Sequence, residues 1–320
     1  MAQHATTTLP QFEVRLAAPD IGRWIGGNTG IPGFTTRAAR RSGPHVLLLA
    51  LSHGNEIAGA IALDRLLAEE LSPACGRITF GFVNLGAFER FDPRQPTLSR
   101  FIDEDINRVW DTALLDGPRK SVELERARAI RPMIDTADVV LDLHSMLWPS
   151  DPLMLCGETA KGRALAAAIG TPELVVADRG HASGRRILDY VRFADPATRF
   201  VANLVEAGQH WHPSTVETML ASVAGLLRHY GMAPDHPALP PPQRRSQRFA
   251  EVTMAVVAGT SSFTFVQPWR GGQVIPRRNT LIAIDAATEI RTPYDDCLLV
   301  MPSLRPSRGH TVVRMARFVV

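Results

Sequence analysis

Cysteine, lysine and long apolar runs are all scarce in this 320-residue sequence, and each scarcity narrows the class of protein. The three cysteines, Cys75, Cys156 and Cys297, are too few and too scattered for a disulfide framework or a cysteine-based zinc site, so we interpret them as small core residues. No stretch approaches the roughly eighteen consecutive apolar residues of a membrane-spanning helix. Residues 1–10 are polar and rich in threonine, without the apolar segment of a signal peptide. These features predict a protein of the reducing cytoplasm that has no membrane partner.

Lysine supplies only 2 of the 35 basic residues, and the other 33 are arginines, set against 32 acidic residues. The arginine clusters are small, such as those at residues 40–41, 244–248 and 277–278. This scatter argues against a nucleic-acid partner, which would need the arginines gathered on one face. With 45% hydrophobic and 21% charged residues, the composition is typical of a folded globular chain with a sizeable core. It leaves a monomer and a homo-oligomer equally open.

Short apolar runs alternate with amphipathic segments from Pro44 to about Met232, which predicts an α/β fold. The expected strands are Val46–Leu51, Ile78–Val83, Val139–Leu143, Leu153–Cys156, Leu174–Ala177 and Phe200–Val205. The expected helices are Glu56–Leu71, Ser121–Ile134, Gly162–Ile169, Gly184–Phe193 and Ser214–His229, the last with Ser214 as its N-cap and Glu217 completing a capping box. We therefore expect a mixed, mostly parallel sheet flanked by helices on both faces. Residues 11–43 are expected to form a leading strand and a glycine-rich loop, which lacks the strand-to-helix setting of a nucleotide site.

The pattern changes at Ala233–Arg248, where five prolines and a basic cluster cannot continue a helix. After it come short apolar runs with strand character and no credible helix. The expected strands here are Ala250–Val257, Ser262–Val266, Thr280–Asp285, Cys297–Met301 and Thr311–Phe318. The sequence therefore predicts an α/β domain over residues 1–232, a proline-rich linker over 233–248 and a small all-β domain over 249–320.

Two histidines and a glutamate follow expected strands in a pattern that suits a metal ion. His53 and Glu56 lie in the turn after one strand, and His144 ends another. In open α/β sheets ligands bind at the carboxyl ends of strands, so these side chains stand where a site is expected. A lone histidine at a strand end is usually a capping or core residue. Two histidines and one carboxylate, however, are a ligand set of catalytic zinc.

Two further segments carry polar residues that could bind a substrate or take part in catalysis. The charged loop Phe101–Arg108 ends in Asn107 and Arg108, whose amide and planar guanidinium together suit a carboxylate. A solvated charged loop is the plainer interpretation. Glu206 ends an apolar strand and, beside zinc, could deprotonate a water molecule; alone it would be an ordinary surface acid.

The motifs HGNE, D-I-N-R, LDLH and E-x-G, in this order, resemble those of the succinylglutamate desuccinylase/aspartoacylase family of zinc-dependent amidohydrolases. The resemblance runs from about Pro44 to the C-terminus and implies a zinc carboxypeptidase-like fold with an added C-terminal β domain. It places one zinc ion on His53, Glu56 and His144, and the catalytic glutamate at Glu206. It places the substrate carboxylate on Asn107 and Arg108, and makes Arg100 the residue that polarises the scissile carbonyl.

The sequence also departs from the aspartoacylase pattern. After the histidine of LDLH it has Ser145-Met146-Leu147-Trp148 in place of Asn-Thr-Thr, and the family's substrate-holding Tyr and Arg have only Tyr190 and Arg199 as candidates. His210 and His212 are interpreted as pocket or surface residues rather than a second metal site, and His210, four residues after Glu206, could line the active site. The roles of these residues and of Tyr294 stay open, as does the acyl group.

Together these observations predict a cytoplasmic zinc-dependent hydrolase that cleaves the amide bond of a small N-acyl amino acid or related amide. Its partner would be that small molecule. The alternative enzyme is a metallocarboxypeptidase acting on peptides, which a β domain covering the zinc cleft would disfavour. A non-catalytic binding module is the alternative from another class, and the intact set of site residues argues against it.

Overall fold

The computed structural model describes residues 12–233, 235–242 and 246–319. The polar segment 1–10 and part of the predicted linker, residues 234 and 243–245, lie outside the described residues. No helix in the described part of the chain is long and apolar enough to cross a membrane.

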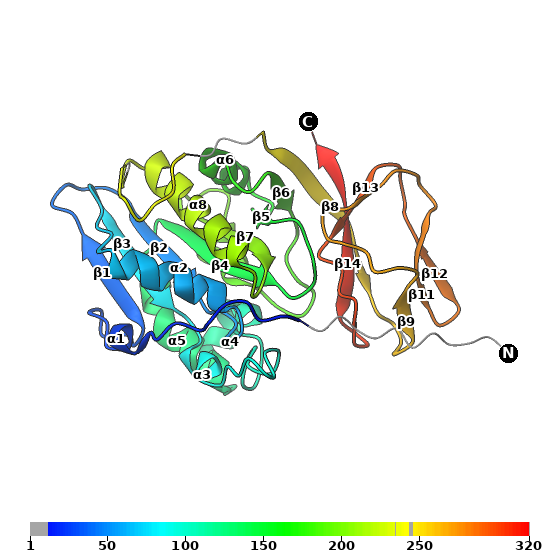
Figure 1. Cartoon of the computed structure of the whole chain (residues 1–320), viewed down its shortest axis with the longest axis horizontal. Coiled ribbons are helices and arrows are strands. Elements are labelled where there is room, and N and C mark those ends of the chain that lie inside the picture. The colour runs from blue at the N-terminus through cyan, green and yellow to red at the C-terminus, as the bar shows by residue number, and fades with distance from the viewer. Residues whose placement is uncertain (1–11, 234, 243–245, 320) are drawn as a thin grey trace.

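One mixed sheet of eleven strands forms the centre of the molecule (Figure 1). In spatial order it contains β1 (Phe34–Ala38), β3 (Arg77–Phe82), β2 (His45–Ala50), β4 (Val139–Met146), β7 (Val201–Gln209), β5 (Leu153–Leu155), β6 (Leu174–Ala177), β8 (Arg248–Val257), β14 (Thr311–Val319), β13 (Cys297–Val300) and β10 (Val274–Ile275). Parallel pairs join β3, β2, β4 and β7, and a second parallel group joins β5, β6 and β8. The predicted mixed sheet is confirmed.

Helices cover both faces of the sheet, because nearly every residue of its central strands is buried and most of these residues are apolar. The helices α2 (Ile57–Ala68), α6 (Ala160–Ile169) and α8 (Pro213–His229) pack on one face, with α2 and α8 side by side in Figure 1. The opposite face carries α5 (Val122–Ile134). This part also contains the short helices α1 (Gly22–Ile25), α3 (Leu85–Phe88) and α4 (Thr112–Asp116). The glycine-rich loop lies between α1 and β1, so the first strand follows that loop.

Two local predictions are wrong. Helix α8 begins at Pro213 rather than after Ser214, and the His212 side chain caps it by accepting from the Ser214 N–H. Proline is preorganised for the first helical position, so the helix begins two residues earlier than predicted. The predicted helix 184–193 is instead a 3₁₀ turn, Ile187–Asp189, and a four-residue helix, α7 (Val191–Ala194). Gly184 has φ +143° and lies against the Arg108 carbonyl, so tertiary contacts override the helical pattern here.

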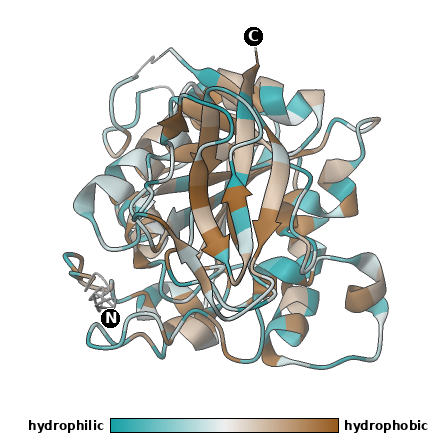
Figure 2. Ribbon diagram, turned by 90° about the vertical axis from the view of Figure 1, so that its right-hand side faces the viewer, coloured by the Kyte–Doolittle hydropathy of each residue, from teal (hydrophilic) through white to brown (hydrophobic). Residues whose placement is uncertain are grey.

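The C-terminal region is all β, as predicted, but it shares the main sheet. Strand β8 pairs in parallel with β6, and β14 pairs antiparallel with β8. A separate three-stranded sheet contains β9 (Phe263–Phe265), β11 (Leu281–Asp285) and β12 (Thr288–Arg291). Figure 2, viewed from this side, shows hydrophobic residues on several strands in the middle of the view and on the flanking helices. The division into domains at residues 232 and 249 stays a proposal.

Candidate metal centre

The candidate site lies at the carboxyl ends of three neighbouring parallel strands. His53 and Glu56 follow β2, while His144 and Glu206 lie in the last part of β4 and β7 and face each other in the strand register. Because parallel strands end at the same edge, residues separated by up to 153 positions in the chain come together here. The structure thus gathers the predicted metal and base residues at one place.

Glu56 lies between the two histidines. Its Oε1 is 2.7 Å from His53 Nδ1, and its Oε2 is 3.2 Å from His144 Nδ1. One ligand atom from each of the three residues can be chosen so that all lie within 4.8 Å of one another. All three side chains are buried. A divalent ion could therefore reach all three donors at once.

A carboxylate holds the other ring nitrogen of each histidine. His53 Nε2 lies 2.9 Å from Asp105 Oδ1, and His144 Nε2 lies 2.8 Å from Asp142 Oδ2. Metal-binding histidines are commonly oriented in this way, which fixes the ring and leaves the opposite nitrogen free for the ion. Sequence reasoning missed Asp105 and Asp142, although each stands two residues before a predicted site residue. The donor set and its supporting carboxylates fit a zinc ion.

The charges of the site are concentrated on buried groups. Burial alone would raise the pKa of Glu56, but His53 and His144 outweigh it and hold this pKa well below its usual range. Burial raises the pKa of Glu206 to about 8. Glu206 Oε2 is buried without a hydrogen-bond partner among the described residues. A buried, unpartnered carboxylate oxygen beside these donors indicates that a further group belongs there.

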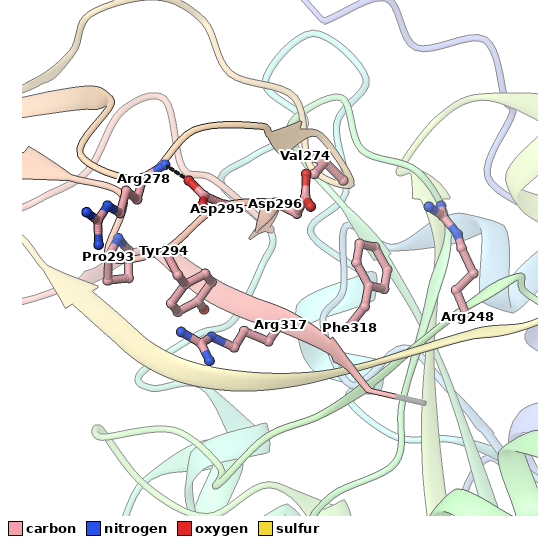
Figure 3. Close-up of a pocket in the computed structure, with 9 residues that line it drawn as sticks. All are labelled: Arg248, Val274, Arg278, Pro293, Tyr294, Asp295, Asp296, Arg317 and Phe318. Atoms are coloured by element: carbon pink, nitrogen blue, oxygen red, sulfur yellow. Dashed lines mark hydrogen bonds between the residues drawn. The ribbon is translucent and has the colours of Figure 1, made fainter.

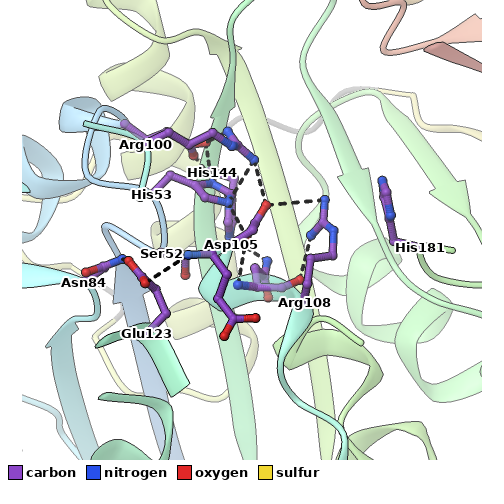
Figure 4. A network of polar contacts seen from close by, with 12 residues as sticks. Ser52, His53, Asn84, Arg100, Asp105, Arg108, Glu123, His144 and His181 are labelled. Carbon is purple, nitrogen blue, oxygen red and sulfur yellow. Dashed lines mark hydrogen bonds and ion pairs between the residues drawn. The ribbon is translucent and has the colours of Figure 1, made fainter. Parts of the chain in front are cut away.

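The loop 100–108 brings the other predicted residues to the same place (Figure 4). Arg100 Nη2 lies 3.2 Å from Asp105 Oδ2, and its Nη1 lies 3.4 Å from Glu56 Oε1. Asn107 Nδ2 is 3.3 Å from His144 Nε2. Arg108 donates from Nη1 to the Asn107 carbonyl at 2.6 Å, and its Nη2 lies 3.7 Å from Asp105. All seven predicted site residues therefore form one cluster.

Glu123 of α5 anchors this loop and was not predicted. Its carboxylate accepts the backbone N–H groups of three consecutive residues, 102, 103 and 104, at 2.6, 3.0 and 3.2 Å. It also accepts from the Asn84 side chain, as Figure 4 shows. Glu123 is completely buried, so these bonds are shielded from water. A single glutamate inside an amphipathic helix gives no sequence signal for such a role.

Of the residues whose roles were open, only His210 reaches the cluster. It is buried, and its Nδ1 lies 2.7 Å from Ser145 Oγ. His212 caps α8. Tyr190 bonds Asp135 and Arg131, Arg199 pairs with Asp138, and Tyr294 bonds Thr253. In the described part of the chain, His53, Glu56 and His144 are the one group suited to a metal, so His210 and His212 form no second centre.

Two cavities lie away from the metal donors. The larger, about 790 Å³, is lined by strand and loop residues of the C-terminal region, among them Arg248, Arg278 and Arg317, and contains none of the predicted site residues (Figure 3). The smaller, about 310 Å³, lies between residues 156–159 and 178–194. We place the chemistry at the buried cluster, because that is where the donors converge.

Comparisons with known proteins point to one family. The model of the succinylglutamate desuccinylase/aspartoacylase catalytic domain matches residues 42–230. The succinylglutamate desuccinylase of Ectopseudomonas mendocina is 41% identical over 93 residues, which are 28% of this chain and only 25% of that relative's length. A solved succinylglutamate desuccinylase/aspartoacylase from Rhodobacter sphaeroides has a TM-score of 0.65 at 20% identity, covering 90% of this chain and 89% of that one. The succinylglutamate desuccinylase of Vibrio cholerae has a TM-score of 0.67 at 17% identity, covering 90% and 86%. These two structures establish likeness of fold.

Proposed function

The chain belongs to the succinylglutamate desuccinylase/aspartoacylase family, and from that premise we propose that it is a zinc-dependent hydrolase of small N-acyl amino acids or related amides. The observation that carries the proposal is the convergence of His53, Glu56 and His144, with Glu206 Oε2 unpartnered beside them. Three free, buried cysteines accord with a reducing compartment such as the cytoplasm.

The residues divide the work as follows. A zinc ion held by His53, Glu56 and His144 would supply Lewis-acid chemistry and make water a better nucleophile at neutral pH. Glu206 would accept the proton of the attacking water and then deliver it to the leaving amine. The Arg100 guanidinium would donate to the carbonyl oxygen as negative charge develops on it. The products are a carboxylate and a free amine.

Asn107 and Arg108 would hold a carboxylate of the substrate and so orient its amide bond. Arg108 is only partly engaged, since its contact with Asp105 is 3.7 Å long, and its side chain is 20% exposed. A bidentate bond to a carboxylate would use donors that the protein leaves available.

The C-terminal strands favour a small substrate over a peptide. Arg314 of β14 lies 3.8 Å from Asp178, and its charge acts on both Arg108 and Glu206. A residue of the C-terminal region thus contributes its charge to the candidate site. Charge from a second part of the chain suits a small charged acyl amino acid better than a continuing polypeptide chain.

The proposal is tested by separating zinc binding from proton transfer. Glu206→Gln is nearly isosteric and should keep zinc but lower kcat on N-acyl amino acids by roughly 10²–10⁴. His144→Ala should lose the zinc, as measured by elemental analysis. Glu217→Gln, the same change at an exposed position of α8, is the matched control and should alter neither. Loss of zinc from Glu206→Gln would mean that Glu206 is a zinc ligand. Unchanged activity of Glu206→Gln would refute its role as the general base.

A further inference from the structure

Ser145 and His210 form a buried pair that the proposed mechanism does not use. Ser145 directly follows the predicted ligand His144, and its backbone N–H donates to Glu56 Oε2 at 2.9 Å. Its hydroxyl lies 2.7 Å from His210 Nδ1. His210 is 1% exposed, and its backbone N–H donates to the Met146 carbonyl where β7 passes β4. The imidazole is thus fixed one hydrogen bond away from the metal donors.

The hydroxyl of Ser145 determines the tautomer of His210. Among the described residues, His210 Nδ1 is the one hydrogen-bond partner of Ser145 Oγ. A buried hydroxyl needs an acceptor for its proton. The Ser145 hydroxyl therefore donates to Nδ1, which leaves the proton of the neutral ring on Nε2.

Within the described residues, the one hydrogen bond of the His210 ring is the bond from Nδ1 to Ser145 Oγ, so its Nε2–H group is left available, and the residue as a whole is 1% exposed. The charged groups that act on the ring are Glu56, Arg100, His53 and His144, all members of the metal centre. Burial lowers the pKa of His210 to about 3, so the ring is neutral at physiological pH. A donor that the protein leaves available beside these charged groups can bond an acceptor on a ligand.

We infer that His210 is a further substrate-contacting residue, whose neutral imidazole donates from Nε2 to an oxygen of the substrate in the metal cleft, and that Ser145 is the positioning residue that fixes its tautomer. This inference rests on the proposed function. The accepting oxygen could be the reacting carbonyl or another oxygen of the acyl amino acid. Donation to the carbonyl as it becomes an oxyanion would act on kcat, whereas donation to an unreactive oxygen would act on KM.

The test uses the zinc-loaded full chain and a panel of N-acyl amino acids. His210→Met removes the donor and should lower kcat/KM roughly ten- to a hundredfold, while zinc content and melting temperature hold. His210→Gln places an amide N–H near the position of Nε2 and should recover most of the loss. The split between kcat and KM in His210→Met identifies the accepting oxygen. His212→Met is the matched control: it removes the neighbouring imidazole and a helix cap, so it should lower stability but not kcat/KM.

A double-mutant cycle tests the link between the two residues. Ser145→Ala keeps the backbone N–H that binds Glu56 but removes the hydroxyl that fixes the His210 tautomer. We therefore expect kcat/KM to fall several-fold. Adding Ser145→Ala to His210→Met should not lower kcat/KM further, because Ser145 acts through the His210 ring. Additive losses, a zinc-deficient His210→Met, or His210→Met with activity within twofold of wild type would each overturn the inference. If the wild-type chain hydrolyses none of the panel, the proposed function itself fails; if it does and the variants match it, only this inference fails.

Discussion

At the scale of single residues, partners rather than residue type separate functional from structural histidines. His45 begins β2, and His53 follows the end of the same strand. The His53 ring lies between the carboxylates of Glu56 and Asp105. The His45 ring instead contacts the Thr79 hydroxyl at 2.8 Å and the Thr136 carbonyl at 3.1 Å, which satisfies a neutral imidazole. His45 is therefore a core residue of the type expected for a lone histidine on a strand.

This contrast gives a prediction about pH. Burial, with Arg77 adding to it, lowers the pKa of His45 to about 4, whereas the unfolded chain has its ordinary value of about 6.5. The unfolded state binds more protons between these values, so stability falls as pH decreases from about 6.5 to about 4. His45 should contribute up to about 3 kcal/mol of that loss.

Urea unfolding of wild type and His45→Gln at pH 7 and pH 4.5 measures the contribution, since glutamine does not titrate. We expect the free-energy gap between the two proteins to shift in favour of the variant at pH 4.5. His229→Gln, at an exposed position, is the control for the loss of an imidazole. A gap that is the same at both pH values would mean that His45 titrates normally.

At the scale of elements, a helix positions a loop that carries four of the site residues. Arg100, Asp105, Asn107 and Arg108 all lie in a segment that has only the 3₁₀ turn Ile106–Arg108 as regular structure. Such a loop holds its side chains in place only if its backbone is anchored. Glu123 provides that anchor from α5 through three consecutive N–H groups.

Glu123→Gln should therefore lower activity by loosening the loop 100–108, although Glu123 itself is not one of the predicted site residues. The amide NH₂ would face N–H donors in place of an oxygen, so at least one accepted hydrogen bond is lost in a buried place, at a cost of about 1–3 kcal/mol. We expect kcat/KM to fall roughly tenfold or more, with a smaller relative change in zinc content. Glu125→Gln on the exposed face of the same helix is the matched control. Equal activity of the two variants would show that the loop does not depend on Glu123.

At the scale of the whole molecule, the main sheet joins the predicted α/β and β parts. The edge of β6 is occupied by β8 over four residue pairs, Leu174–Ala177 with Arg248–Glu251. Ala250, Leu298, Val300 and Ala316 of the C-terminal strands belong to the same apolar cluster as Trp110 and Leu204 of the α/β part. Removing the C-terminal region would expose both an unpaired strand edge and apolar surface.

We accordingly predict that the chain unfolds in one cooperative step. Calorimetry of the zinc-free protein should show a single transition whose calorimetric and van't Hoff enthalpies agree. A chain ending at residue 232 should fail to give a stable monomer, because it loses the partner of β6. Two separate transitions, or a folded 1–232 fragment, would instead support independent domains at the predicted boundaries.

The sequence by itself determined the candidate site residues and most of the elements. Alternation of apolar and amphipathic segments located the strands that became β2, β4 and β7, since local hydrophobic periodicity reports burial directly. Motif order led to His53, Glu56, His144, Glu206 and the Asn107–Arg108 pair, and the structure brings these residues together. Strand ends place their side chains at a common edge, so this convergence follows from topology that the sequence pattern already implies.

The tertiary structure alone decided what depends on distant partners. The contact of Asp105 with His53, the Glu123 anchor and the Ser145–His210 pair join segments up to 65 residues apart, and no local pattern records such pairing. Tertiary contacts also explain why the helix predicted at 184–193 does not form over its full length. Gly184 packs against Arg108, and Arg186 pairs with Asp178. The junction of β8 with β6 likewise follows from long-range hydrogen bonding between strands 70 or more residues apart in the chain. Local periodicity specifies which face of a segment is apolar, whereas only the assembled fold specifies which partner covers it.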